Sequence, residues 1–175
     1  MKTALVVAIA SALLMTDFAR AAPAAKPKPH PTVAGFWEQS DDDGVVGAWF
    51  LFEEKDGFFD GRLVKLFKKA DEPMVELCLK CTGDQKNARM LGLTIINGMK
   101  RYGLNYKDGS ILDPRDGSVY HAEMTMSPDG QKLAVRVYLL IPLLGKTQVW
   151  NRLPDDAIAP EDIPPEVLAP PEAKP

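Results

Sequence analysis

Several features that mark particular protein classes are scarce or missing in this sequence of 175 residues. Two cysteines are too few for a disulfide-stapled mini-protein or for a zinc site made of four cysteines. The phosphate-binding glycine loops and the nucleophile elbow of common enzyme families do not occur either. We therefore predict no catalytic residue, no metal site and no cofactor. The net charge of −3 also argues against a protein that binds nucleic acid by neutralising phosphates.

Long hydrophobic runs are also missing, apart from residues 4–15 near the N-terminus. As a helix this run would be about 18 Å long, well short of the ~30 Å hydrocarbon core of a membrane. Lys2 precedes the run and the small residues Ala19 and Ala21 follow it, which is the layout of a secretory signal peptide. We predict a signal peptide over residues 1–21, cleavage after Ala21, no integral membrane span and a periplasmic or secreted protein.

The 15 prolines gather near the two ends of the sequence. Residues 22–32 contain four of them and residues 154–175 contain seven. The first stretch is typical of an extended Pro/Lys spacer, and the second, with six acidic residues and one lysine, of a disordered acidic tail. The tail is either a solvated end or a strip that binds a partner protein. Residues 33–153 remain as the folded domain.

Residues 33–153 show the pattern of short antiparallel strands joined by tight turns. Leu133, Val135 and Val137 alternate with more polar residues, and this period of two indicates strands with one buried face. Since no apolar pattern of helical length appears, we expect an all-β, antiparallel up-and-down barrel of about eight strands, whose closure removes exposed edges. Gly61, inside an expected strand, predicts a bend or a bulge, as closure of a barrel needs. Turns are expected where aspartate precedes glycine: Asp43-Gly44, Asp56-Gly57, Asp108-Gly109, Asp116-Gly117 and Asp129-Gly130.

The two ends of this domain carry tryptophan motifs. Gly35-Phe36-Trp37 opens the first expected strand, and Trp150-Asn151-Arg152 ends the last one. Together they resemble the calycin superfamily, which comprises lipocalins, fatty-acid-binding proteins and avidins. The resemblance implies that Trp37 closes one end of the barrel and that Arg152 packs across its ring. A guanidinium stacks well on an indole, which gives this pairing a physical basis.

Longer segments of the same domain carry a second resemblance. They occur in the order G-F-W, D-D-D-G, F-F-D-G-R-L-V-K-L, C-L-K-C, I-L-D-P-R-D-G-S-V-Y, L-A-V-R-V-Y and G-K-T-Q-V-W-N-R. This series resembles the bacterial secreted family catalogued as domain of unknown function 2147, whose fold is a lipocalin-like barrel. The resemblance implies an exported envelope protein whose barrel can hold an apolar ligand. It implies no catalytic residue, because the family has no agreed activity.

Apolar residues of the expected strands are the candidates for the interior of the barrel. An eight-stranded barrel is near the size at which side chains alone fill the centre or one small ligand fits. Both possibilities stay open on the sequence. The candidate ligand-binding residues are Phe50, Phe52, Phe58, Leu63, Tyr120, Met124 and Val135.

Both cysteines lie in residues 67–90, a polar stretch that interrupts the strand pattern and predicts a long loop. In an exported protein the pair Cys78 and Cys81 favours a disulfide, which would hold this loop rather than the whole fold. A redox pair would need a thiolate at a helix N-terminus beside a βαβ unit, and a metal site would need two further ligands.

These observations lead to three hypotheses on function. The first is an exported, non-catalytic barrel that binds a small apolar or amphipathic ligand in the cell envelope. The alternative is a protein-interaction module with a solid core, which would act through the loop 67–90 and the acidic tail. The second alternative is a thiol-active protein that uses Cys78 and Cys81.

Overall fold

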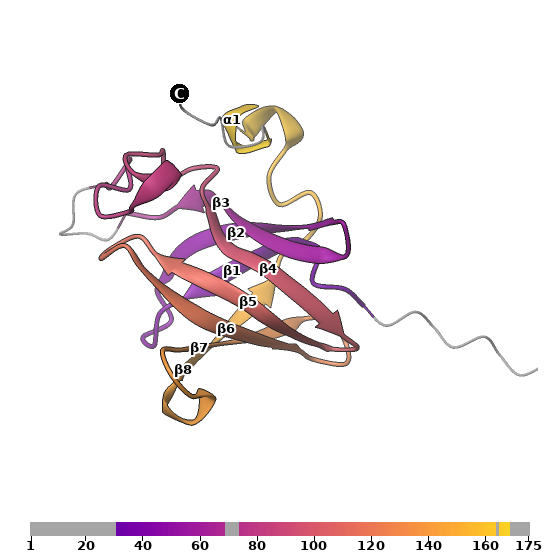
Figure 1. The fold of residues 1–175 in the computed structure, drawn as a ribbon. Coiled ribbons are helices and arrows are strands. Elements are labelled where there is room, and N and C mark those ends of the chain that lie inside the picture. The colour runs from indigo at the N-terminus through magenta and orange to yellow at the C-terminus, as the bar shows by residue number, and fades with distance from the viewer. Residues whose placement is uncertain (1–30, 69–73, 164, 169–175) are drawn as a thin grey trace, which may run out of the picture.

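The computed structural model describes residues 31–68, 74–163 and 165–168, and Figure 1 shows how they fold. Each strand pairs antiparallel with the next, and β8 returns to pair with β1 through Trp37–Arg152 and Glu38–Asn151. The predicted all-β, up-and-down barrel of about eight strands is thus confirmed. The strands are β1 (Gly35–Ser40), β2 (Val46–Lys55), β3 (Phe58–Leu66), β4 (Thr94–Tyr102), β5 (Asn105–Asp113), β6 (Ser118–Met126), β7 (Lys132–Tyr138) and β8 (Lys146–Arg152).

The predicted signal peptide and the spacer as far as residue 30 lie outside the described residues. Within the part of the chain that the structure describes, no helix is long and apolar enough to cross a membrane.

Two Asp-Gly pairs show how local turn signals and strand register interact. Asp56 and Gly57 both have positive φ, as the tight turn of a two-residue hairpin requires, and they join β2 to β3. The turn predicted at Asp108-Gly109 is wrong, because both residues lie inside β5 at a register shift. A Cβ on Gly109 would come 2.6 Å from the carbonyl oxygen of Asn97, so glycine is needed there for close strand approach.

The predicted bulge at Gly61 is present in β3, where the pairing with β4 shifts on both sides of this residue. A Cβ at this position would lie 3.0 Å from the ring of Phe52 and 3.2 Å from Ile96. The missing side chain therefore lets β3 bend inward over the packed interior.

The connections divide between the two ends of the barrel. The N-terminal segment and the β2–β3, β4–β5 and β6–β7 hairpins lie at one end, which we call the closed end. The opposite, open end carries the β1–β2, β5–β6 and β7–β8 connections and the long loop 67–93. This loop contains the 3-10 turn η1 (Gly83–Gln85), and the β7–β8 connection contains η2 (Pro142–Leu144).

The segment after β8 differs from the expected disordered tail over its described part. It forms η3 (Pro160–Asp162) and α1 (Pro165–Leu168), and Figure 1 shows α1 beside β3. The segment covers apolar side chains on the outer face of β1–β3, and the Nη1 of Arg62 donates a hydrogen bond to the carbonyl oxygen of Val167 at 3.1 Å. The cluster contains buried Phe36, Val64 and Val167 and partly buried Trp49, Leu51, Leu91, Leu153, Ile158 and Ile163.

This packing has a physical reason that composition alone does not reveal. Ile158, Ile163 and Val167 recur every four to five residues, so the segment presents an apolar side to the sheet. Prolines between them reduce the conformational freedom of the unfolded chain, which lowers the entropic cost of ordering the segment.

Candidate functional site

The closed end of the barrel is built around Trp37 and Arg152. The guanidinium carbon of Arg152 lies 4.3 Å from the centre of the Trp37 ring, on the neighbouring strand. Its Nε donates to the carbonyl oxygen of Gly130 at 2.6 Å and its Nη1 to that of Ala34 at 2.9 Å. Its Nη2 donates to the carbonyl oxygen of Thr32. Arg152 thus ties together the N-terminal segment, the β6–β7 hairpin and β8.

The N-terminal residues 31–34 form the second layer of this closure. The Nε1 of Trp37 donates to the carbonyl oxygen of Val33 at 2.7 Å, and the amide of Val33 donates to the hydroxyl oxygen of Tyr106 at 2.8 Å. Burial raises the pKa of Tyr106 and lowers the pKa of Arg152, although Asp155 and Tyr106 oppose the second shift. Every buried polar group named here has a partner, which is the condition for a stable closure.

The interior candidates divide into those that face inward and those that do not. Phe50, Phe52, Leu63, Met124 and Val135 belong to the buried core cluster. Whether they contact a ligand remains a prediction.

The structure places Phe58 outside the barrel, with 45% of its surface exposed, and buries Phe59 instead. The alternation of β3 explains the difference, because Phe59, Gly61 and Leu63 share the inner face. Tyr120 is partly buried toward the open end, two residues from buried Ala122.

Several interior residues were missed from the sequence. Trp150 stacks on Phe50 with ring centres 4.6 Å apart, and Phe59 meets Tyr106 edge to face at 5.1 Å. Met99 and Met126 are also buried. The signal for Trp150 was present, since it alternates with Gln148 and Arg152 in β8, but we used Trp150 only as part of a terminal motif. No buried polar or charged side chain other than Trp and Tyr occurs among the described residues, so the interior is apolar.

At the open end, the long loop folds back on the barrel. Cys78 and Cys81 form the predicted disulfide, and both residues are buried in the core cluster. The sulfur of Cys78 lies 3.8 Å from the carbonyl oxygen of Pro114, and Gly117 lies against the carbonyl of Lys80 so closely that no Cβ would fit. The disulfide therefore holds the loop against the β5–β6 turn.

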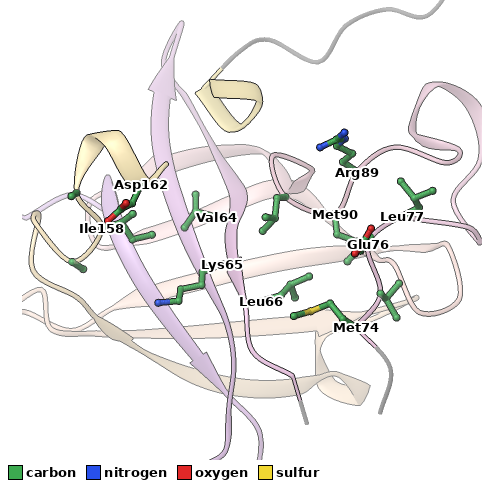
Figure 2. A pocket seen from close by; sticks show the side chains of 14 residues that line it. Val64, Lys65, Leu66, Met74, Glu76, Leu77, Arg89, Met90, Ile158 and Asp162 are labelled. Atoms are coloured by element: carbon green, nitrogen blue, oxygen red, sulfur yellow. The ribbon is translucent and has the colours of Figure 1, made fainter. Parts of the chain in front are cut away.

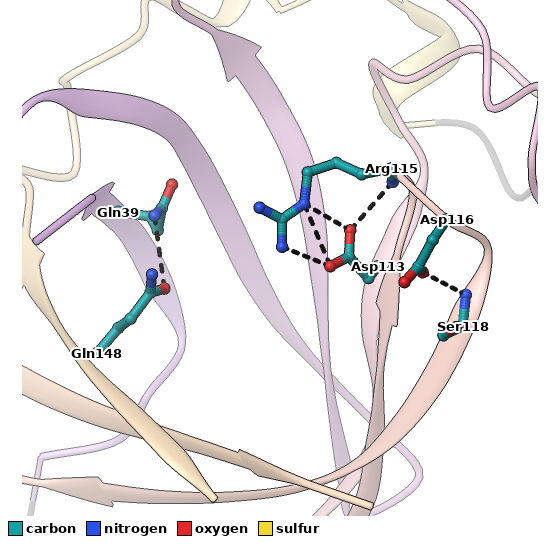
Figure 3. Close-up of polar contacts among 6 residues, drawn as sticks. All are labelled: Gln39, Asp113, Arg115, Asp116, Ser118 and Gln148. Carbon is teal, nitrogen blue, oxygen red and sulfur yellow. Dashed lines mark hydrogen bonds and ion pairs between the residues drawn. The ribbon is translucent and has the colours of Figure 1, made fainter.

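Figure 3 shows polar side chains from the same end of the barrel. Gln39 donates through Nε2 to the Oε1 of Gln148 at 3.4 Å. Arg115 pairs with Asp113 at 2.5 Å, and this pairing lowers the pKa of Asp113. An apolar interior with polar side chains at one end suits an amphipathic ligand.

A connection rich in leucine joins β7 to β8 at the same end. The guanidinium of Arg136, on the outer face of β7, donates to the carbonyl oxygens of Pro142 at 2.7 Å and Leu143 at 3.2 Å and to Thr147 at 2.8 Å. The β7–β8 connection is thereby held in one shape, with Leu140 and Leu143 exposed by 86% and 82%. Contiguous exposed apolar side chains are more frequent at interaction sites than on the rest of a protein surface.

A groove of about 810 Å³ lies outside the barrel (Figure 2). Its walls are the end of β3, the parts 74–77 and 89–91 of the long loop, and residues 157–162 of the C-terminal segment. The lining is mainly apolar, with Lys65 and Asp162 among its charged residues. Across the described ranges, no group of three or more His, Cys, Asp or Glu side chains could hold a metal ion.

Comparisons with known proteins agree with this geometry. The model of a family described as "Uncharacterized protein conserved in bacteria (DUF2147)" matches residues 35–152, which is the barrel from β1 to β8. A solved structure of protein HP1028 from Helicobacter pylori, described as belonging to the lipocalin family, superposes with a TM-score of 0.64. The two are 20% identical, and the alignment covers 78% of this chain and 96% of HP1028. No curated protein matches the sequence.

Proposed function

Because this chain belongs to the DUF2147 family of bacterial proteins and folds as a lipocalin-like barrel, we propose that it is an exported, non-catalytic protein that binds a small apolar or amphipathic ligand. The observation that carries the proposal is a barrel with an apolar interior, one end sealed by Trp37 and Arg152 and polar side-chain pairs at the other end. The layout of residues 1–21 supports export to the periplasm or beyond the cell.

The interior offers the free energy and the adaptability that such binding needs. Each CH₂ group moved from water into an apolar interior contributes about 0.8 kcal/mol. Met99, Met124 and Met126 are buried among the aromatic rings, and unbranched methionine side chains change rotamer readily to accommodate a guest. A ligand with a slim hydrocarbon chain can therefore take the place of contacts between interior side chains while the hydrogen bonds between the strands stay intact.

Native purification followed by solvent extraction and mass spectrometry tests the proposal directly. We expect a lipid-like molecule in stoichiometric amount, and protein stripped of it should bind a fluorescent fatty-acid analogue. Ala122→Phe, which fills the interior, should abolish that binding, whereas Ala134→Phe on the outer face should not. Thermal unfolding checks that both variants fold. An empty barrel that binds no such analogue would refute the proposal.

A second candidate function is protein interaction, and the outer groove favours it. The groove is formed by the long loop and the C-terminal segment, the two parts that this hypothesis assigns to binding. Its apolar lining with charges of both signs suits an extended segment of a partner protein that carries apolar residues. Met74 and Val75 are half exposed, so M74E/V75E should leave stability unchanged.

Crosslinking in the cell envelope tests this candidate. A partner crosslinked to the wild-type protein should be lost in M74E/V75E and retained in the control V45E, which changes an exposed valine of the β1–β2 hairpin. Equal crosslinking in all three proteins would refute a role for the groove.

Thiol activity finds no support in the geometry, because both cysteines are buried and attack on a disulfide needs access to a sulfur. A reduction potential below about −300 mV would identify the bridge as structural, and a value near those of thiol oxidoreductases would restore this alternative.

A further inference from the structure

One buried donor in the barrel interior lacks a partner. Within the described residues, the Nε1 of Trp150 is the buried side-chain nitrogen or oxygen without a hydrogen bond, and Trp150 is only 2% exposed. The other two indoles are satisfied, since Trp37 donates to the carbonyl oxygen of Val33 at 2.7 Å and Trp49 to Glu38 at 3.1 Å. Buried donors are nearly always paired in folded proteins, so an unpaired one calls for an explanation.

Trp150 lies on the inner face of the barrel. It lies midway along the inner face of β8, two residues from Gln148 toward the open end and two residues from Arg152 toward the closed end. At about 3.3 Å per residue, the backbone of Trp150 lies roughly 7 Å along β8 from that of Gln148. The ring is held by stacking on Phe50 at 4.6 Å and by Phe52 at 6.3 Å. Its orientation is therefore fixed before any ligand arrives.

The surroundings restrict the chemistry of the missing partner. An indole N–H only donates, so the partner must supply an acceptor atom. The nearest cation along β8 that could pair with an anionic ligand is Arg152. Its guanidinium already donates hydrogen bonds to the carbonyl oxygens of Gly130, Ala34 and Thr32. An ionised carboxylate would lose its hydration with one donor as compensation, which disfavours it strongly. A neutral acceptor fits.

We propose that Trp150 Nε1 binds the neutral carbonyl or ether oxygen of a slim apolar ligand, such as a ketone or an ester. This inference rests on the proposed function and specifies the ligand class of the same interior. The Nε1 atom has less than 1 Å² of accessible surface in the ligand-free barrel, so the ligand must displace a side chain. The interior methionines Met99, Met124 and Met126 are the most adaptable ones to do so.

Three probes of equal chain length separate the possibilities: dodecane, 2-dodecanone and ionised dodecanoate. We expect the ketone to bind about tenfold more tightly than the alkane, and the carboxylate more weakly than the ketone. Trp150→Phe keeps an aromatic ring but removes the donor, so it should bring the ketone-to-alkane ratio close to one. Trp49→Phe, which removes an indole on the outer face, should leave the ratio unchanged.

The indole ¹⁵N–¹H spectrum of the wild-type protein gives a second readout that needs no variant to fold. Three indole signals are expected from the three tryptophans, and the ketone should shift the Trp150 proton downfield while the alkane shifts it little. Equal affinity for ketone and alkane, or no selective shift at Trp150, would overturn this inference and leave ligand binding intact. Failure of all three probes to bind would count against the proposed function itself.

Discussion

Replacement of Arg152 by methionine tests the closed end of the barrel. Methionine retains the length and apolar character of the side chain but loses its donors. The carbonyl oxygens of Gly130, Ala34 and Thr32 then lose their shared partner, and the Trp37 ring loses its cation. Because these contacts join chain segments more than 20 residues apart, we expect the N-terminal segment to separate from the barrel before the strands unfold.

The expected magnitude follows from these contacts. A hydrogen bond to a charged group contributes about 1.5–3 kcal/mol and a cation–π contact about 0.5–2 kcal/mol. Removing the buried charge recovers part of its desolvation cost, and the freed carbonyls of Ala34 and Thr32 can bind water because both residues are partly exposed. We therefore expect a net loss of about 3 kcal/mol in the free energy of unfolding. For a domain of this size, that corresponds to a fall of about 12 °C in Tm.

Arg136→Met is a matched control for Arg152→Met. Arg136 also makes three hydrogen bonds, but on the exposed β7–β8 connection, so its loss should cost less than about 1 kcal/mol. Circular dichroism during thermal and urea unfolding measures both variants. Equal effects of the two substitutions, or a fall of less than about 3 °C for Arg152→Met, would refute the view that Arg152 stabilises the closed end.

Three further predictions concern the disulfide, a buried tyrosine and the C-terminal segment. Replacing both Cys78 and Cys81 by serine should lower stability by about 2 kcal/mol in urea unfolding, and no effect would show that the loop is held without the bridge. Burial raises the pKa of Tyr106, so as pH rises the unfolded chain loses the phenolic proton of Tyr106 before the folded protein does. The free energy of unfolding should therefore fall as pH rises above about 10. Tyr106→Phe should flatten that fall, and an unchanged slope would contradict the raised pKa of Tyr106. Val167→Ala should cost about 1–2 kcal/mol and Val149→Ala, at an exposed site, less than 0.5 kcal/mol; equal Tm shifts would mean that the segment does not pack.

The barrel could be predicted because its signals are repeated along the chain. The alternation around Leu133 and Val135 and the turn at Asp56-Gly57 agree with the structure, as does the bulge at Gly61. The turn predicted at Asp108-Gly109 was wrong because an Asp-Gly pair can form either a turn or a β-bulge. The choice depends on how close Asn97 of the neighbouring strand comes, and a single strand holds no information on that distance.

The site was harder to predict than the fold. Strict alternation back from Leu63 would have selected Phe59 rather than Phe58, so that error was avoidable. The unpaired donor of Trp150 was not accessible to any sequence pattern, since it depends on which acceptors the seven other strands place near it. The packing of the described part of the C-terminal segment was not predicted, for a related reason. Its few apolar residues stabilise it only because an apolar strip around Phe36 and Val64 lies on the sheet beneath them.

The two ends of the barrel are held very differently, and this asymmetry bears on how a ligand would exchange. At the closed end, Arg152, Trp37 and Tyr106 join residues 31–34 to three separate strands by buried or part-buried hydrogen bonds. At the open end, the disulfide is buried, but the side-chain pairs Gln39–Gln148 and Arg115–Asp113 and the contacts of Arg136 are part-buried or exposed. Local opening occurs where buried contacts and protected hydrogen bonds are few, so a ligand of Trp150 should leave past Gln148. Substitutions at the closed end should therefore lower stability without changing the rate at which ligand dissociates.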